Sequence, residues 1–434
     1  MVGFSGDRVM PVVGGIAGAM SRGRQARPAP LSFTQTSRIE GAPSQMTTPT
    51  PVATRPEDLG IDSAKLEAVF ARAKRDVDDG TLPSAQIAVA RQGRLAGLRT
   101  YGRVLHGDTE APATDDTLYT IFSCTKAVVG AAVWTLCEDG KLRLEEKVAE
   151  IIPEFGTNGK EGITVEQVLL HIGGFPMAPF RATDWDDRPR RLQRFSQWRL
   201  NWEPGSQFQY HASSAHWVLA EIIERRTGKD FRAYIRERIL DPMGLKNFYI
   251  GMPRELNAKV ADVRYMGDPV PPEGGWGEVT PEAITGLNAI EQRLVGVPGG
   301  GGIAGAAQLA LFYQPLINGG VTADGTRIMK AETIEWATKV RTKAFHVDPI
   351  LGHPINRALS VMVAGDDGHA ALRGFGNTTS ARAFGHGGAG GQIGWGDPET
   401  GISVGYCTDG FLDPIAQGRR GVAISSLAAQ CLKG

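Results

Sequence analysis

The spacing of hydrophobic residues predicts a helix and two strands near the start of the chain. Between residues 65 and 79, apolar side chains recur at helical spacing, at Leu66, Val69, Phe70, Ala73 and Val77. Residues 86–90 and 95–101 follow as two apolar runs around Gln92-Gly93, which is typical of strands joined by a turn. We therefore expect a helix followed by a β-hairpin.

A second hairpin and a closing helix are predicted at the other end. Residues 391–395 and 402–407 flank the turn-forming segment 397–401, and residues 422–432 have a helical pattern. Strands at both ends, with helical segments between them, predict a single sheet built from the two terminal parts of the chain.

This pattern divides the chain into three parts. Residues 1–55 are rich in Gly, Pro, Ser, Thr and Arg and are predicted to form an N-terminal arm. Residues 56–124 and 301–434 would form an α/β sheet lobe, and residues 125–300 a mostly helical lobe inserted into it.

Composition excludes several classes of function. The chain has 47 basic and 47 acidic side chains in 434 residues, so neither nucleic acid nor an anionic membrane is expected as a partner. Its four cysteines lack Cys-x-x-Cys spacing and are expected to be buried thiols.

No apolar run is long enough to cross a membrane. A cytoplasmic location is expected; the short apolar stretch 11–20 leaves secretion or a periplasmic location open.

The candidate chemistry lies at the start of a central helix. Residues 127–137 are apolar on nearly all sides, so this helix is expected to be buried. Just before it, Ser123 and Lys126 are three positions apart and would share a helix face. A serine can act as a nucleophile if the lysine is its base, and burial beside a helix N-terminus would lower the pKa of Lys126 toward that role. A serine that only caps the helix is the alternative.

Two further motifs place the chain near a known family. Ser123-Cys124-Thr125-Lys126, then Phe208-Gln209-Tyr210-His211-Ala212, then His386-Gly387-Gly388-Ala389, resemble in order and spacing the three motifs of the serine β-lactamase and penicillin-binding protein superfamily. The chain is most similar to its family VIII carboxylesterases, which are related to class C β-lactamases. The resemblance covers residues 56–430 and implies an α+β fold, with an antiparallel sheet flanked by helices and a mostly helical inserted lobe.

The resemblance also implies a role for each matching residue. Ser123 would be the acylated nucleophile, Lys126 its base and Tyr210 a second acid or base. The amides of Ser123 and Ala389 would form the oxyanion hole, with His386, Gly387 and Gly388 beside the substrate. Neither a cofactor nor a metal is expected, and the oligomeric state is left open.

Two positions depart from the family pattern. Ala212 stands where the middle motif usually has Asn, and His386 stands where peptidases and lactamases usually have Lys. That lysine helps to hold a substrate carboxylate, so we expect no fixed cation at the site. The sequence therefore favours a serine carboxylesterase acting on small, short-chain neutral esters.

Other interpretations remain open at this stage. Tyr210 could be a core residue, and His386 could cap its turn. An amidase, a β-lactamase or an acyltransferase on the same scaffold is the alternative activity, and a non-catalytic binding domain is a further one. The glycine run 299–302 has no following Gly-Lys-Ser/Thr, so no nucleotide site is predicted.

Overall fold

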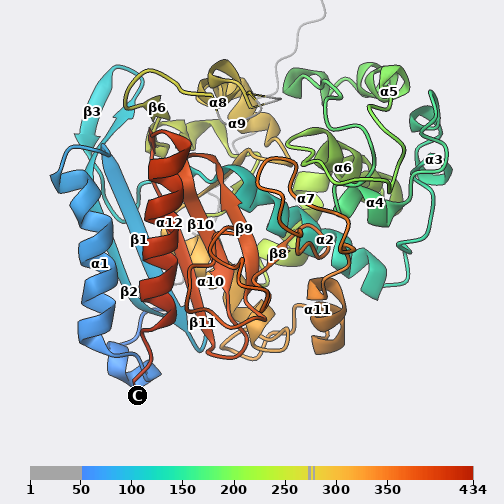
Figure 1. The fold of residues 1–434 in the computed structure, drawn as a ribbon. Coiled ribbons are helices and arrows are strands. Elements are labelled where there is room, and N and C mark those ends of the chain that lie inside the picture. The colour runs from blue at the N-terminus through green and yellow to red at the C-terminus, as the bar shows by residue number, and fades with distance from the viewer. Residues whose placement is uncertain (1–50, 272–274, 277–278, 434) are drawn as a thin grey trace, which may run out of the picture. The chain divides into compact units, whose positions relative to one another are not determined.

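A seven-stranded antiparallel sheet organises the protein, in the order β3-β2-β1-β11-β10-β9-β8 (Figure 1). The computed structural model describes residues 51–271, 275–276 and 279–433. The strands are β1 (Ser84–Arg91), β2 (Arg94–His106), β3 (Thr109–Pro112), β8 (Met362–Val363), β9 (Phe384–Gly388), β10 (Gln392–Gly396) and β11 (Ile402–Cys407). The junction of β1 with β11, where Gln86 pairs with Cys407 and Arg91 with Ile402, joins the two ends of the chain. The predicted sheet and both predicted hairpins are thus confirmed.

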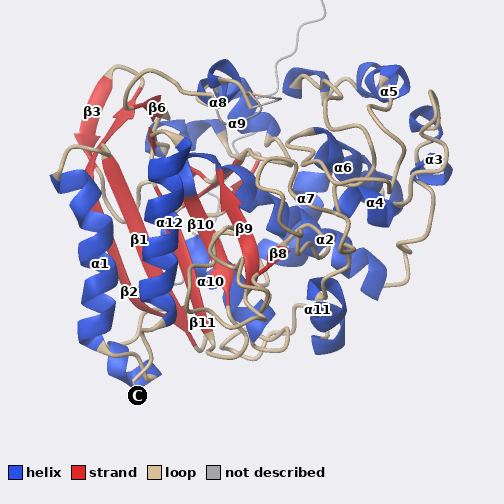
Figure 2. Cartoon of the chain, in the orientation of Figure 1, coloured by secondary structure: helices blue, strands red, loops and turns tan. Residues whose placement is uncertain are grey.

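Helices cover both faces of this sheet (Figure 2). α1 (Ser63–Asp78) and α12 (Pro414–Ala429) lie side by side on one face, and α10 (Ala306–Ile317) packs on the other. A Cβ on Gly405 of β11 would lie only 2.1 Å from the Ala306 carbonyl oxygen, so glycine lets α10 approach the sheet this closely. The closing helix begins earlier than predicted, because Asp413 caps it and Pro414 starts its first turn.

The central helix α2 (Thr125–Glu138) is buried from Thr125 to Leu136, as its apolar sequence predicted. It ends at Asp139, and Gly140 follows with a φ of 69°. α6 (Ser214–Thr227), α7 (Phe231–Ile235) and α11 (Ala331–Thr338) pack against it. The other helices are α3 (Val148–Ile151), α4 (Val165–Leu169), α5 (Arg188–Gln197), α8 (Pro281–Gly286) and α9 (Ile290–Val295). The element that begins at the candidate nucleophile is thus held by helices from two later parts of the chain.

Two small sheets complete the described structure. β4 (Tyr119–Thr120), β7 (Gly302–Ala304) and β5 (Tyr249–Ile250) form one, and β12 (Gly410–Phe411) pairs in parallel with β6 (Arg264–Tyr265) in the other. The pairing of β4 with β7 brings the segment before Ser123 beside the glycine run 299–302.

Residues 1–50 of the predicted arm lie outside the described residues. Its last part adjoins β2, because the Ala53 amide donates to the Leu95 carbonyl over 2.9 Å. The predicted lobe boundaries at 124/125 and 300/301 stay a prediction. No helix within the described ranges is both long and apolar enough to cross a membrane.

Candidate active site

Ser123 lies in a tight turn that is held from several sides. It is the middle residue of a 3₁₀ turn, Phe122–Cys124, which leads directly into α2. Phe122 has a φ of 45°, an uncommon conformation for a bulky residue. Its carbonyl accepts the Thr125 hydroxyl over 2.5 Å, and its ring packs edge-on against Phe411 at 5.2 Å. These contacts fix the turn and leave Ser123 partly exposed between buried neighbours.

Lys126 points back toward Ser123, and two carbonyl groups hold its ammonium. Its Nζ lies 3.3 Å from Ser123 Oγ and donates to the carbonyls of Ala212 over 2.7 Å and Gly299 over 2.5 Å. We call these two carbonyls the lysine cradle. The side chain is fully buried. A neutral amine held in this place would lie within reach of the Ser123 hydroxyl and could accept its proton.

The cradle explains the glycine run that sequence reasoning left without a role. A Cβ on Gly299 would lie 3.3 Å from Lys126 Nζ and 3.1 Å from the Ala212 oxygen, so the backbone here approaches the lysine closely. Ala212, where the family usually has Asn, also contributes through its backbone.

Tyr210 lies beside the lysine, on the extended segment before α6. Lys126 Nζ is 5.0 Å from the centre of its ring, and the His171 ring is 4.8 Å away. The Tyr210 hydroxyl is buried and has no hydrogen-bond partner among the described residues. A core tyrosine normally satisfies its hydroxyl. Tyr313 and Tyr406 also have buried hydroxyls without partners in the described part of the chain, so what distinguishes Tyr210 is its place beside the candidate base, in the wall of a cavity that Ser123 also lines.

Three buried histidines pack behind Tyr210. His171 is stacked on His216 at 5.7 Å and lies 5.9 Å from His211. Burial lowers the pKa of each of these imidazoles, that of His211 to about 3. They are therefore neutral near pH 7. Among the described residues, no group of three His, Cys, Asp or Glu side chains could hold a metal ion.

The third motif forms a wall of the site beside the nucleophile turn. A Cβ on Gly388 of β9 would lie 2.5 Å from the Ile121 oxygen, so this strand can pass the nucleophile turn only with glycine there. The Cys124 thiol, which donates to the His386 carbonyl over 3.0 Å, ties the turn to the same strand. Ala389 follows directly, and it lines the same two cavities as Ser123.

His386 is neutral, and the cation of this wall is Arg357, which sequence reasoning missed. Arg357 Nη1 lies 3.0 Å from His386 Nε2, and its Cζ lies 5.0 Å from the centre of the Tyr210 ring. Burial first, and then the charges of Arg357 and Lys126, lower the pKa of His386 well below its usual range. Since His386 Nδ1 contacts the Gly387 carbonyl at 2.6 Å, the proton belongs on Nδ1 and Nε2 accepts from Arg357. The expectation of no fixed cation is therefore wrong.

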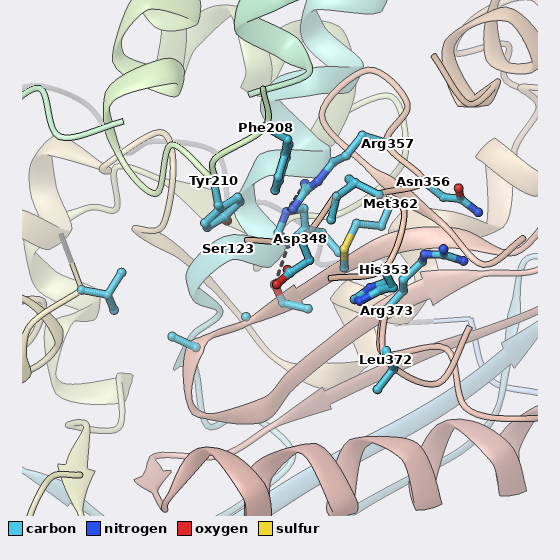
Figure 3. A pocket seen from close by; sticks show the side chains of 16 residues that line it. Ser123, Phe208, Tyr210, Asp348, His353, Asn356, Arg357, Met362, Leu372 and Arg373 are labelled. Carbon is cyan, nitrogen blue, oxygen red and sulfur yellow. Dashed lines mark hydrogen bonds between the residues drawn. The ribbon is translucent and has the colours of Figure 1, made fainter. Parts of the chain in front are cut away.

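Two cavities meet at Ser123. One, of about 390 Å³, is lined by Tyr210, Arg357 and His386 among others. Figure 3 shows the side chains of Tyr210 and Arg357 near Ser123. The other, of about 590 Å³, is mostly apolar, with Phe180 and Trp217 in its wall. The lining of the first cavity is mostly apolar as well. We call the two the Tyr210 cavity and the Trp217 cavity.

Comparison with known proteins places this geometry in a family. The model of the family described as Beta-lactamase matches residues 69–426. The chain is similar to the esterase/β-lactamase LipL of Mycobacterium tuberculosis, with 28% identity over 327 residues, 70% of this chain and 72% of LipL. It is also similar to the esterase EstB of Burkholderia gladioli, with 30% identity over 214 residues, 44% of this chain and 52% of EstB.

Two solved structures share the fold. A penicillin-binding protein homologue from Caulobacter crescentus has a TM-score of 0.74 and 27% identity, covering 86% of this chain and 99% of that one. A family VIII carboxylesterase has a TM-score of 0.72 and 25% identity, with the same coverage of both chains. Together with the match over residues 69–426, these similarities show that the chain belongs to the Beta-lactamase family and is a serine hydrolase.

Proposed function

We propose that the protein is a serine carboxylesterase that hydrolyses small, short-chain carboxylic esters through an acyl-enzyme intermediate. The observation that carries this proposal is the position of Lys126, whose Nζ is 3.3 Å from Ser123 Oγ while two backbone carbonyls bind its hydrogens. This arrangement supplies a nucleophile and a fixed base without a histidine or a metal.

In the proposed reaction, Ser123 Oγ attacks the ester carbonyl and its proton passes to Lys126. The carbonyl oxygen becomes an oxyanion, for which the amides of Ser123 and Ala389 are the proposed donors. The C–O bond to the alcohol then breaks as Tyr210 gives its proton to the leaving oxygen, and Lys126 passes the proton taken from Ser123 to Tyr210, which restores both groups. Water repeats the sequence on the acyl-enzyme and releases the carboxylic acid.

Esters are favoured over amides by two features of the site. An amide nitrogen must be protonated before it leaves, and Ala212 offers no side-chain amide to orient it. The Trp217 cavity of about 590 Å³ has room for an apolar acyl group, and several similar proteins are esterases. Arg357 nevertheless supplies a cation for a substrate carboxylate, so slow β-lactam opening is the second candidate activity.

A labelling experiment combined with a substrate panel tests this proposal. A fluorophosphonate should add once to Ser123, as read by peptide mass spectrometry, and Ser123→Ala should abolish both labelling and turnover. The specificity constant should be highest for a 4-nitrophenyl ester such as the butyrate, lower for a cephalosporin and lowest for a D-Ala-D-Ala peptide. Labelling of another serine, or a lactam or peptide that is cleaved faster than every ester, would overturn the assignment.

A further inference from the structure

The turn between β9 and β10 carries the proposed oxyanion donor Ala389. It spans Ala389–Gly391, and we call it the β9–β10 turn. Gly390 and Gly391 have φ angles of 78° and 84°, a conformation that favours glycine. Glycine leaves a backbone with little stiffness of its own, whereas an oxyanion hole works only if its donors are fixed before the reaction. The β9–β10 turn therefore needs support from other parts of the protein.

Arg420 of α12 supplies such support. Its Nη2 donates to the Gly390 carbonyl over 2.6 Å, and only 1% of the surface of Arg420 is exposed. A Cβ on Gly391 would lie 2.3 Å from Nη2, so the guanidinium occupies the space that a side chain at position 391 would fill. The Phe411 ring contacts the same turn, since a Cβ on Gly390 would lie 2.6 Å from it. An arginine and an aromatic ring thus hold the turn together.

The Arg420 side chain makes few other interactions. Its bond to Gly390 is its one hydrogen bond among the described residues, and its Nε and Nη1 are buried without acceptors there. Its Cζ lies 5.7 Å from the centre of the Tyr406 ring. The nearby Asp76, whose charge reaches Tyr406, is paired with Arg72 over 2.7 Å. A buried guanidinium with so few partners is costly, and such departures from good packing are expected where function requires them.

The other buried arginines show how uncommon this arrangement is. Three of them are each paired with a carboxylate: Arg191, Arg293 and Arg373. Among the described residues, only Arg357 and Arg420 are buried arginines that form no ion pair. Arg357 contacts His386 on β9, and Arg420 contacts Gly390 just after it. Both unpaired buried arginines therefore lie against the third motif.

We propose that Arg420 is a positioning residue of the oxyanion hole, which binds the Gly390 carbonyl and so fixes the direction of the Ala389 amide. This inference rests on the proposed esterase function. Arg420 itself lines neither cavity at Ser123, so it acts through the turn and not on the substrate. Its loss should weaken binding of the tetrahedral intermediate, whose oxyanion the amide holds, much more than binding of the ester.

A boronic acid that imitates the intermediate tests this role. Butane-1-boronic acid should add to Ser123: a B–O bond forms, the hydroxyl proton passes to Lys126, and the boron becomes a tetrahedral anion. Arg420→Met should raise the Ki of this inhibitor and lower kcat/KM for 4-nitrophenyl butyrate by the same factor, about 10- to 100-fold, the scale of a misplaced oxyanion donor. The loss should appear in kcat and leave KM nearly unchanged, because the ester in its ground state has no oxyanion.

Two variants are the controls. Arg420→Lys keeps the positive charge and a donor for the Gly390 carbonyl, so it should recover most of the loss. Arg419→Met removes the exposed neighbour of Arg420 on the same helix and should leave both the Ki and kcat/KM unchanged. All rates are expressed per Ser123 that a fluorophosphonate labels at completion, so that a partly unfolded variant is not mistaken for a slow one.

Arg420→Gln keeps the inference testable if Arg420→Met does not fold. Its side chain is polar but shorter than that of arginine, and it should show the same parallel change in Ki and kcat/KM. A fall in kcat/KM without a matching rise in Ki, or no change in either, would overturn the inference, because a merely structural arginine would act that way. A wild-type protein that neither hydrolyses the ester nor binds the boronic acid would instead refute the esterase proposal itself.

Discussion

Gly299→Ala probes the lysine cradle without removing any catalytic group. The added Cβ would lie 3.3 Å from Lys126 Nζ, 3.1 Å from the Ala212 oxygen and 3.5 Å from His216 Cβ. Carbon atoms in contact are normally 3.5–4.0 Å apart, so either the amine or the backbone must shift by a few tenths of an ångström. The Nζ–Oγ distance is already 3.3 Å, and a shift of that size away from Ser123 takes it to about 3.6 Å, beyond hydrogen-bond range.

The expected result is a fall in kcat of about 10- to 100-fold, the cost of misplacing a catalytic group by less than 1 Å. Burst kinetics with a 4-nitrophenyl ester separate acylation from later steps, and acylation should be the slowed step. Gly300→Ala is the control, since a Cβ there would have no neighbour closer than 4.0 Å. Both glycines line the Trp217 cavity, so an effect of the methyl group on acyl binding would appear in both variants. Equal kcat for the two variants would refute the cradle.

Three further predictions follow from other groups. Tyr210→Phe should lower kcat by at least about 10²-fold with an unchanged circular dichroism spectrum; near-normal turnover would make Tyr210 structural. Burial and the charge of Arg357 keep His386 neutral. The His386→Gln variant should therefore have the same midpoint in the acidic limb of its pH–rate profile as the wild type, even if its rate is lower. A shifted midpoint would show that His386 titrates in that range. Burial raises the pKa of Asp409 to about 6 from its ordinary 3.8, so the folded state favours the protonated acid, and this stabilisation is lost as the pH rises through 6. In urea denaturation, Asp409→Asn should therefore add about 2 kcal/mol more to the free energy of unfolding at pH 8 than at pH 4; equal changes would contradict it.

The sequence predicted well those parts of the fold that depend on patterns among neighbouring residues. The apolar stripe of α1, the all-round apolar character of α2 and the turn between β10 and β11 each depend on residues close together in the chain. The same holds for Ser123 and Lys126, which share one helical turn. The start of α12 was missed because Gly418 and Gly421 weaken its helical pattern, whereas the cap at Asp413 and the proline after it decide where it begins.

The lysine cradle could be predicted only in part. A glycine run commonly indicates that the backbone comes close to another group. Here that group is the ammonium of Lys126 on α2, and the residues near the run do not identify it. Likewise, Ala212 looks like the loss of a functional asparagine. Its carbonyl still binds the lysine, because backbone geometry at that position does not depend on the side chain.

Arg357 lay beyond sequence reasoning for a related reason. It belongs to a loop 29 positions before His386, and the hydrogen bond between the two side chains exists only in the folded protein. From the motif alone, histidine in place of lysine indicates a lost positive charge. In the structure, the two residues act as a unit, since a lysine at 386 would set an ammonium against a guanidinium where the imidazole now accepts its hydrogen bond over 3.0 Å. Like charges so close and so well buried repel strongly. A neutral acceptor at position 386 is therefore what allows Arg357 to occupy the site, and the positive charge that related enzymes carry on this motif comes here from another part of the chain.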